Sequence, residues 1–396
     1  MCKGPVEGSF DLNGREVGLI TAYLFHLGDN ADPCLLKVND GLAFKGCEIG
    51  SLGYLLTPDE TEFAEFSLIN DPRDSSRKLL KPYIGGSDLV EGVTRRYVLD
   101  VDGLSEQAIK SLPRVFQYLE EAVRKDFLAR GEVRDDNVEW WHFRRPSLAL
   151  RRSLGTLPKL LVLCRVSEAA AFTFVSGDSI ANSDIICFRF SDFASYCVLQ
   201  SCIHEIWARM MASTFEDRLR YTPSDSFGTF PFPANYQTHA ALAATGEAYF
   251  NLRTQLSAQF GEGLTDIYNR FHDPQETHPQ IVQLRGLYDA MNRAVLDAYK
   301  WFDIQARCEF LPEANDEDDD GDCRSKPCEY RYRWADEIHD LIFVKLLLLN
   351  RARAEQEAQS MAGTPTAKAS TGRSRKPAKH APVSAQAILI HEETTE

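Results

Sequence analysis

One stretch of the sequence, residues 200–233, constrains the fold more than any other. Apolar residues recur at helical spacing through its first part, which predicts an amphipathic helix beginning near Phe193. Ser191 or Asp192 is the expected N-cap of this helix. The helical period is then lost, and the stretch ends in Thr-Phe-Pro-Phe-Pro at residues 229–233, where the prolines fix an extended backbone. The fold must therefore bury one helix face beside a stiff aromatic segment.

The two faces of this predicted helix differ in character. The apolar face consists of Tyr196, Leu199, Ile203, Ile206, Trp207 and Met210. The opposite face carries His204, Glu205 and Arg209, and we expect it to be exposed to solvent. A lone histidine on an exposed helix face is more often a surface residue than a catalytic base, so we assign no catalytic residue here.

Charge is unevenly distributed along the chain. The 396 residues carry a formal net charge of -14, which disfavours nucleic-acid binding by a uniformly acidic surface. The acidic excess is concentrated in residues 313–322, a predicted solvated loop, whereas residues 114–159 are locally basic. A basic surface patch is therefore compatible with the acidic total.

The cysteines and the hydropathy indicate a cytoplasmic protein. The chain has ten cysteines but no signal-peptide pattern, which favours reduced thiols over a disulfide framework. No segment has the length and apolarity of a membrane helix, and no cysteine or histidine spacing is typical of a metal site. We therefore expect no membrane association and no metal.

Strand-forming and helix-forming segments alternate in the first 235 residues, which predicts an α+β fold with helices packed on a mixed sheet. Strands are expected at 17–25, 34–38, 159–165, 171–175 and 185–190, and a helix at 112–128. Between them, Trp140 to Pro146 places aromatic rings beside two arginines. This mixture suits phosphate contact and base stacking, although adjacent tryptophans are also typical of a core and its lid.

The rest of the chain is predicted to be helical and then disordered. Helices are expected at 247–260, 264–274, 284–301 and through 341–349. The final part is rich in Ala, Ser, Thr, Lys and Pro, which is typical of a disordered tail. We therefore divide the chain into a domain at 1–235, a helical segment at 236–355 and a tail at 356–396.

Several motifs occur in the order found in one enzyme family. Ser-x-x-His-x-x-Trp at 201–207, Arg-Tyr-Thr-Pro at 220–223 and Thr-Phe-Pro-Phe-Pro at 229–233 resemble the target-recognition region of large adenine-specific DNA methyltransferases. These are the type IIG-like enzymes of restriction-modification systems and the methylases of DISARM-type phage-defence clusters. Pro-Tyr-x-x-Gly-x-Asp-Leu at 82–89 fits the start of that region, and residues 264–274 and 290–301 resemble its C-terminal helical segment.

Two positions depart from the family pattern. Asn292 stands where the family usually has Asp, and Lys300 stands where it usually has Gly. The second change bears on how the helix ends, because Gly is the favoured residue after a helix C-terminus and Lys is not.

The resemblance implies a recognition role without catalysis in this chain. An adenine methyltransferase needs a Gly-rich S-adenosylmethionine loop and an Asn/Asp-Pro-Pro-aromatic loop, yet the sequence contains no Pro-Pro dipeptide and no such Gly-rich turn after a strand. We therefore expect no cofactor in this chain, with S-adenosylmethionine held by a separate catalytic domain or subunit. The implied partner is double-stranded DNA.

Candidate DNA contacts follow from the positions of basic and aromatic residues. They are Arg144, Arg145, Arg151, Arg152, Arg218, Arg220 and Tyr221. Two alternatives stay open: a non-catalytic module that kept this fold and binds a protein, which the acidic total charge favours slightly, and a degenerate gene fragment. A loss of duplex affinity with rising salt distinguishes DNA binding from a neutral protein contact, because only the former releases counterions.

Overall fold

The computed structural model describes residues 10–12, 15–17, 32–132, 140–154, 157–211, 213–215, 218–312 and 330–362. The predicted acidic loop at 313–322, the predicted tail beyond residue 362 and most of the predicted strand at 17–25 lie outside these ranges. The remaining predictions can be compared with the structure, which combines mixed sheets with helices and confirms the α+β class.

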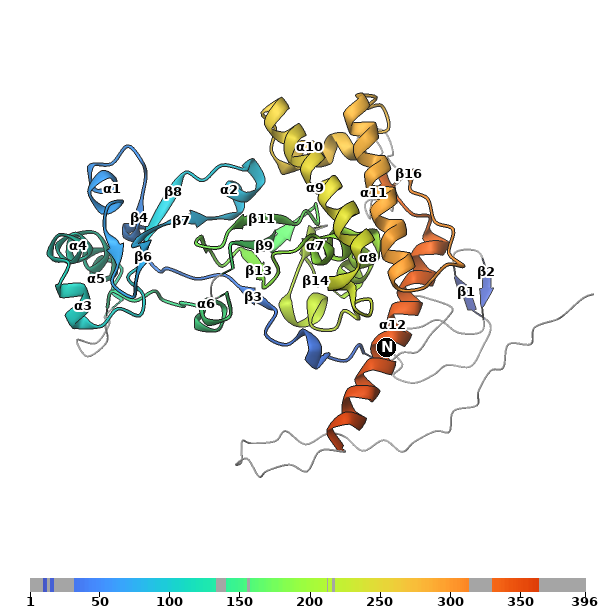
Figure 1. Cartoon of the computed structure of the whole chain (residues 1–396), viewed down its shortest axis with the longest axis horizontal. Coiled ribbons are helices and arrows are strands. Elements are labelled where there is room, and N and C mark those ends of the chain that lie inside the picture. The colour runs from blue at the N-terminus through green and yellow to red at the C-terminus, as the bar shows by residue number, and fades with distance from the viewer. Residues whose placement is uncertain are drawn as a thin grey trace, which may run out of the picture.

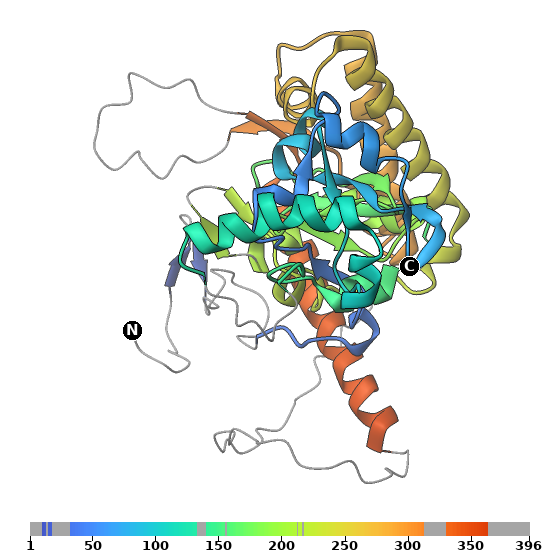
Figure 2. The same cartoon turned by 90° about the vertical axis from the view of Figure 1, so that its left-hand side faces the viewer.

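Along the long axis of the molecule, a lobe built from the N-terminal part lies at one end, a sheet lies in the middle, and long helices lie at the other end with β1 (Phe10–Leu12) and β2 (Arg15–Val17) beside them (Figure 1). Figure 2 views the molecule from the end that carries the lobe. The N-terminal part contains β1 Phe10–Leu12, β2 Arg15–Val17, η1 Lys37–Asn39, β3 Ala43–Lys45, η2 Leu52–Tyr54, β4 Leu55–Leu56, α1 Thr61–Phe66, β5 Asn70–Asp71, β6 Asp74–Lys78, β7 Leu80–Ile84, α2 Gly86–Glu91, β8 Arg96–Leu99, α3 Glu106–Lys110, α4 Pro113–Leu119, η3 Glu120–Arg124 and α5 Lys125–Ala129. The lobe has its own core, in which the strands β12 (Ile180–Ala181), β7, β8 and β4 form, in this order, a sheet packed against α3 to α5. The predicted helix at 112–128 is the continuous run from α4 to α5.

A second sheet lies in the middle of the molecule, with strand order β11-β9-β13-β3. The middle part contains α6 Leu148–Leu154, β9 Lys159–Cys164, β10 Val166–Ser167, β11 Thr173–Ser176, β12 Ile180–Ala181, β13 Ile185–Phe188, α7 Phe193–Gln200, α8 Cys202–Met211, β14 Ser213–Phe215, β15 Arg218–Arg220 and η4 Pro223–Phe227. The neighbours in this sheet are antiparallel, with Leu163 opposite Ile186 and Val162 opposite Thr173. Strand β13 is buried along its whole length, which explains its continuous apolar sequence. The predicted strands at 159–165, 171–175 and 185–190 are confirmed.

The helix predicted from Phe193 is two helices, because the chain breaks at Ser201. Asp192 is the N-cap of α7, where its carboxylate accepts the backbone N–H of Ser195 at 2.8 Å. Ser201 is extended, with ψ 159°, and its hydroxyl accepts the backbone N–H of His204 at 3.4 Å. Serine is a favoured N-cap, so it can end one helix and start the next. The prediction of a single helix was wrong at this point.

The C-terminal helices complete the core of the middle sheet. They are preceded by η5 Tyr236–Thr238 and consist of α9 Ala240–Phe260, α10 Leu264–His272, α11 Pro279–Ala298 and α12 Asp336–Ala362, with the hairpin β16 Glu309–Pro312 and β17 Tyr330–Arg333 between the last two. One hydrophobic cluster runs from Leu161 to Leu346. Helices α7 and α9 pack closely because Gly246 has no side chain, and a Cβ there would lie 2.4 Å from the carbonyl oxygen of Phe193. The predicted division at residue 235 therefore does not separate two cores.

The segment at residues 34–38 is fixed to α12. Asn350 accepts the Cys34 N–H at 2.9 Å and donates to the Cys34 carbonyl at 2.8 Å, and Glu357 accepts the N–H groups of Lys37 and Val38. These side chains satisfy backbone groups that a neighbouring strand would otherwise pair. The predicted strand at 34–38 is therefore wrong, and the segment ends in the short helix η1. Helix α12 also continues past residue 355, where the tail was predicted to begin.

Lys300 ends α11 in a left-handed conformation, with φ 62°. Its N–H donates to the Asp297 carbonyl at 2.9 Å, and the Trp301 N–H donates to the Leu296 carbonyl at 3.0 Å. These two bonds form the helix-ending motif in which glycine is usual, because a side chain on a left-handed residue is strained. The end of α11 therefore has the backbone conformation that glycine usually adopts at this position, although the residue is lysine.

Lys300→Gly is expected to raise the free energy of unfolding by about 1 kcal/mol, because it removes the strain of a left-handed residue that has a Cβ. Urea denaturation of the full chain measures this difference. The matched control is Lys300→Ala, which removes the charge but keeps the Cβ and should give no gain. Equal stability of the parent and the glycine variant would contradict the explanation.

Candidate nucleic-acid interface

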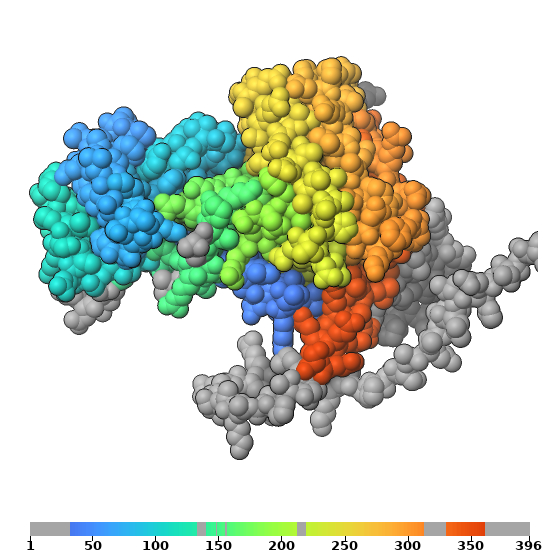
Figure 3. All heavy atoms as spheres, in the orientation of Figure 1, coloured from blue at the N-terminus to red at the C-terminus, as the bar shows by residue number. Residues whose placement is uncertain are grey.

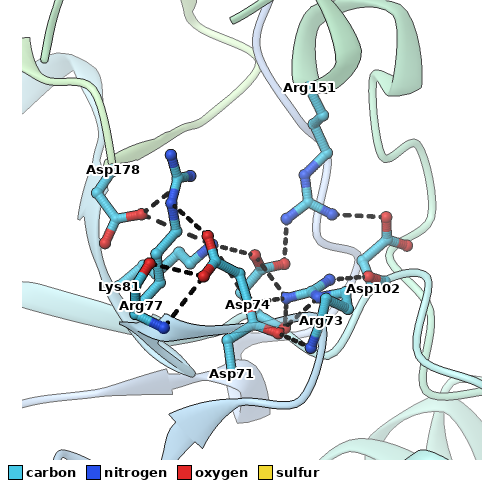
Figure 4. Close-up of polar contacts among 10 residues, drawn as sticks. Asp71, Arg73, Asp74, Arg77, Lys81, Asp102, Arg151 and Asp178 are labelled. Atoms are coloured by element: carbon cyan, nitrogen blue, oxygen red, sulfur yellow. Dashed lines mark hydrogen bonds and ion pairs between the residues drawn. The ribbon is translucent and has the colours of Figure 1, made fainter. Parts of the chain in front are cut away.

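A cleft of about 320 Å³ lies between the N-terminal lobe and the middle sheet. Hairpin β5–β6, strand β7, the end of β8, helix α6 and the β11–β12 turn contribute to its lining. Its charged residues are five basic and five acidic: Arg73, Arg77, Lys81, Arg151 and Arg152, with Asp71, Asp74, Asp100, Asp102 and Asp178. The space-filling view shows the lobe as one end of the molecule, and the close-up shows how these side chains meet (Figures 3 and 4).

Asp100 is the centre of this charge network. Its side chain is 1% exposed and lies 2.9 Å from Lys81 and 3.0 Å from Arg73, and it also contacts the Arg151 guanidinium. Burial raises the pKa of Asp100, but the charges of these three neighbours outweigh burial and hold the pKa below its usual value. The carboxylate is therefore ionised at neutral pH and stabilises the folded state.

Arg151 links helix α6 to the N-terminal lobe through Asp100 and Asp102. Its Nη1 atom lies 2.7 Å from the Asp102 carboxylate, which also accepts the Phe143 N–H at 3.2 Å. The Arg151 side chain is 18% exposed, and its charge is neutralised inside the protein. The structure therefore gives Arg151, a predicted DNA contact, a structural role.

Tyr221 and His204 are both buried, contrary to the sequence-based expectation. Each is 0% exposed, and the Tyr221 hydroxyl lies 2.9 Å from His204 Nε2. Burial lowers the pKa of His204 to about 3, so the ring is neutral at physiological pH. The face assignment was wrong because the helical period was counted through the break at Ser201. Tyr221 cannot contact DNA in this position.

Glu205 and Arg209, predicted to be exposed beside His204, are half-buried. Burial raises the pKa of Glu205, but Arg209 at 2.8 Å and Arg331 at 3.8 Å lower it to about 2. These charges connect α8 to strand β17. These two side chains therefore join elements of the fold and do not form the solvent-exposed face that the sequence predicted.

An exposed arginine pair lies on the loop before α6. The side chains of Arg144 and Arg145 are 51% and 76% exposed, and Arg145 lies 3.4 Å from Glu48. Paired backbone bonds of 2.9 Å between Arg145 and Glu48 fix the loop against the chain that follows β3. The loop therefore presents two guanidinium groups on a rigid backbone, as the predicted DNA contacts require.

The tryptophans before this pair belong to the core and its edge. Trp141 is 5% exposed and donates its indole N–H to the Leu104 carbonyl at 3.0 Å. Trp140 is half-buried, against Phe116 and Arg124. Trp141 is therefore a core residue, as one of the two interpretations of the adjacent tryptophans predicted. Its ring does not contribute to an aromatic surface for stacking on bases.

The three remaining predicted contacts occupy different positions. Arg152 is exposed and lines the cleft. Arg220 is half-buried on β15, opposite Val166 and Ser213. Arg218 begins β15, and its side chain lies outside the described part of the structure. The sequence analysis missed Arg77 and Asp178, which lie far apart along the chain and carry no local motif.

The site therefore combines a mixed sheet, an exposed arginine loop and a charged cleft, and the sheet shares its core with a helical segment. Residues 44–234 match the family described as MmeI, target recognition domain. Among solved structures, the chain is similar to the type IIL restriction-modification enzyme MmeI in complex with DNA, with a TM-score of 0.54 and 15% sequence identity.

That similarity covers 86% of this chain and 39% of the MmeI chain, so the present chain spans well under half the length of that enzyme. The similarity extends beyond the family match and therefore includes helices of the C-terminal segment. No curated protein matches the chain. Within the described ranges, no helix is long and apolar enough to span a membrane, and no group of side chains is arranged to hold a metal ion.

Asp100→Asn is expected to lower the free energy of unfolding at pH 7 by about 3–5 kcal/mol, because it removes one carboxylate from three largely buried cations. The folded-state pKa of Asp100 is lowered, so its contribution is fully present above the ordinary Asp pKa of about 4 and is lost as the pH falls below that value through the lower folded-state pKa. The difference in the free energy of unfolding between the parent and Asp100→Asn should therefore become smaller in acid. Urea denaturation across this pH range measures it.

The control for this variant is Asp74→Asn, at the rim of the same cleft, where the side chain is 50% exposed. It should leave the stability nearly unchanged. If Asp100→Asn were as stable as the parent at pH 7, the network would not have the central role assigned to it.

Tyr221→Phe is expected to lower the free energy of unfolding by about 1–3 kcal/mol, because His204 Nε2 loses its partner while the ring packing is kept. His204 Nδ1 has no hydrogen-bond partner in the structure, so nothing compensates on that side. Duplex affinity measured by fluorescence anisotropy should not change. A loss of affinity with unchanged stability would show that Tyr221 contacts DNA.

Proposed function

We propose that this chain is the DNA target-recognition part of a site-specific adenine-N6 DNA methyltransferase in a restriction-modification or phage-defence system. Its role is to dock double-stranded DNA, read base edges and deliver the target adenine to a catalytic domain. That domain, which would bind S-adenosylmethionine, belongs to another part of the system, a separate domain or subunit. The system would act in the cytoplasm.

The observation that carries this proposal is the rigid, exposed arginine pair in a region that matches the MmeI target recognition domain. Arg145 is held by paired backbone bonds to Glu48, and the Arg144 N–H donates to the Ile49 carbonyl, so binding does not have to order the loop first. Arginine binds phosphate bidentately and can also read guanine. The acidic carboxylates that face the pair, Glu132 at 3.8 Å and Glu48 at 3.4 Å, make surface contacts that DNA can replace.

Salt dependence of duplex binding tests the proposal. The logarithm of the association constant should fall linearly with the logarithm of salt concentration, with a slope of about -0.9 for each neutralised phosphate. The acidic total charge favours the alternative, a module that binds a protein. Absence of duplex binding, or binding that does not weaken with salt, would support that alternative.

The double variant Arg144→Ala, Arg145→Ala is expected to weaken duplex binding and to reduce the magnitude of the salt slope by about 1–2, because each lost phosphate contact removes about one unit. Fluorescence anisotropy at several salt concentrations measures both quantities. If one arginine reads a base instead, its loss should cost about 1–3 kcal/mol at one position of the site.

Arg114→Ala is the matched control for the double variant, because the Arg114 side chain is 61% exposed and pairs with Glu65 on α1, away from the loop. It should bind as the parent does. The assignment of the loop would be wrong if the double variant bound DNA as tightly as the parent at the same salt concentration.

A further inference from the structure

The cleft has an inner and an outer layer of charge. The inner carboxylates Asp71, Asp100 and Asp102 are 1–3% exposed and are matched by Arg73, Lys81 and Arg151. The outer layer contains Arg77 on β6, with a side chain 33% exposed, and Arg152 on α6. The side chains of Asp74 and Asp178, 50% and 36% exposed, lie in the same layer, so Arg77 and Arg152 are the outer cations of the cleft, whereas the inner charges satisfy one another.

The two outer arginines come from separate elements and line one hollow. Figure 4 shows Arg77 beside Asp74 and Asp178 on one side, with Arg151 and Asp102 on the other. Two of the Arg77 contacts are long, at 3.4 Å to Asp74 and 3.6 Å to Asp178, whereas the contacts of Asp100 with Arg73 and Lys81 are 2.9–3.0 Å. Among the described residues, the Arg152 side chain makes no ion pair or hydrogen bond. Arg152 is therefore available to a ligand, and Arg77 can exchange its two long carboxylate contacts for contacts with an anion.

The shape and lining of the cleft restrict what enters it. A flipped base requires a stacking surface, and the lining contains no aromatic side chain. The base edges of a duplex lie within its grooves, so a hollow in the protein does not reach them. Phosphate groups protrude from the duplex and match the planar fork of arginine.

We propose that Arg77 and Arg152 together grip one phosphate of the DNA backbone at the mouth of this cleft. The inference rests on the proposed function. The phosphate replaces Asp74 and Asp178 at the Arg77 guanidinium, and Lys81, at 3.7 Å, remains to neutralise Asp178. The inner network holds the floor of the site, since Asp100 and Asp102 fix the positions of β6 and α6 through Arg73 and Arg151.

The site lies next to the arginine loop of the proposed interface. The Phe143 N–H is bonded to Asp102 at 3.2 Å, immediately before Arg144, and the chain enters α6 after Pro146. The inner network therefore fixes the loop and the cleft relative to each other. A phosphate in the cleft would set the register of the duplex against the loop, because phosphate contacts position a protein and base contacts specify the sequence.

The test is the salt slope of duplex binding, measured for the full chain and for four variants. Arg77→Ala and Arg152→Ala should each lower the magnitude of the slope by about 1. The double variant should lower it by no more than either single variant, because both arginines share one phosphate. Arg77→Lys should keep most of the slope, since the charge remains, and should bind several-fold more weakly because the fork is lost.

The control is Arg95→Ala, whose side chain is 57% exposed and pairs with Glu91 on α2; it should keep the parent slope. Far-ultraviolet circular dichroism and thermal unfolding confirm that each variant is folded. If the parent binds DNA with a steep slope and Arg77→Ala has the same slope, the cleft assignment is wrong while the proposed function stands. If the parent does not bind DNA, the proposed function fails first.

Free phosphate is the competing source of the same chemistry. The melting temperatures of the parent and of Arg77→Ala would be compared in inorganic phosphate and in chloride at equal ionic strength. Phosphate should not raise the melting temperature of the parent more than that of Arg77→Ala. A stabilisation by phosphate that Arg77→Ala abolishes, together with an unchanged DNA slope, would make the cleft a site for a free anion and overturn the assignment to DNA.

Discussion

The buried Asp100 carboxylate imposes the constraint on which the arrangement of the recognition surface depends. A carboxylate removed from water is strongly unfavourable unless cations and hydrogen bonds replace its hydration. Here the replacements come from Arg73, Lys81 and Arg151, which lie on three different elements. The hairpin β5–β6, strand β7 and helix α6 are thereby held together by the need to neutralise one residue. The loop that carries Arg144 and Arg145 runs directly into α6, so its position follows from the same requirement.

A second constraint connects the recognition region with the C-terminal helices. The cluster from Leu161 to Leu346 has no break at the end of the aromatic segment 229–233. Phe230 is 0% exposed and packs against His204, with ring centroids 4.5 Å apart, and the side-chain amide of Asn350 donates to the Thr229 carbonyl at 2.6 Å. The stiff aromatic segment therefore serves as an internal support. The middle sheet and the C-terminal helices therefore share one core, and the segment 229–233 lies within it.

The sequence predicted best where a local pattern decides the outcome. Strands β9 and β13 are continuous apolar runs because both faces are covered, and Asp192 precedes a helix at a position where a carboxylate caps it. The break at Ser201 was missed because serine is tolerated within a helix as well as at its start. That miss also placed His204 on the wrong face.

The candidate site was less predictable because it depends on tertiary contacts. Arg145 and Arg151 are the same residue type six positions apart in the sequence, yet one is 76% exposed and the other is neutralised by Asp100. Nothing near Arg151 in the sequence shows that Asp100 lies beside it. The cleft residues from Asp71 to Asp178 are likewise spread over more than a hundred positions and meet only through the folding of two sheets.

The central claim is that this chain recognises a DNA sequence, and selection from a pool of duplexes with a randomised core tests it most directly. The full chain would be incubated with the pool at moderate salt, and the bound duplexes would be amplified and sequenced over several rounds. Because phosphate contacts carry no sequence information, only base recognition enriches a motif. The account predicts that one short consensus emerges. Duplexes that are bound and stay random, or a chain that retains no duplex, would contradict it.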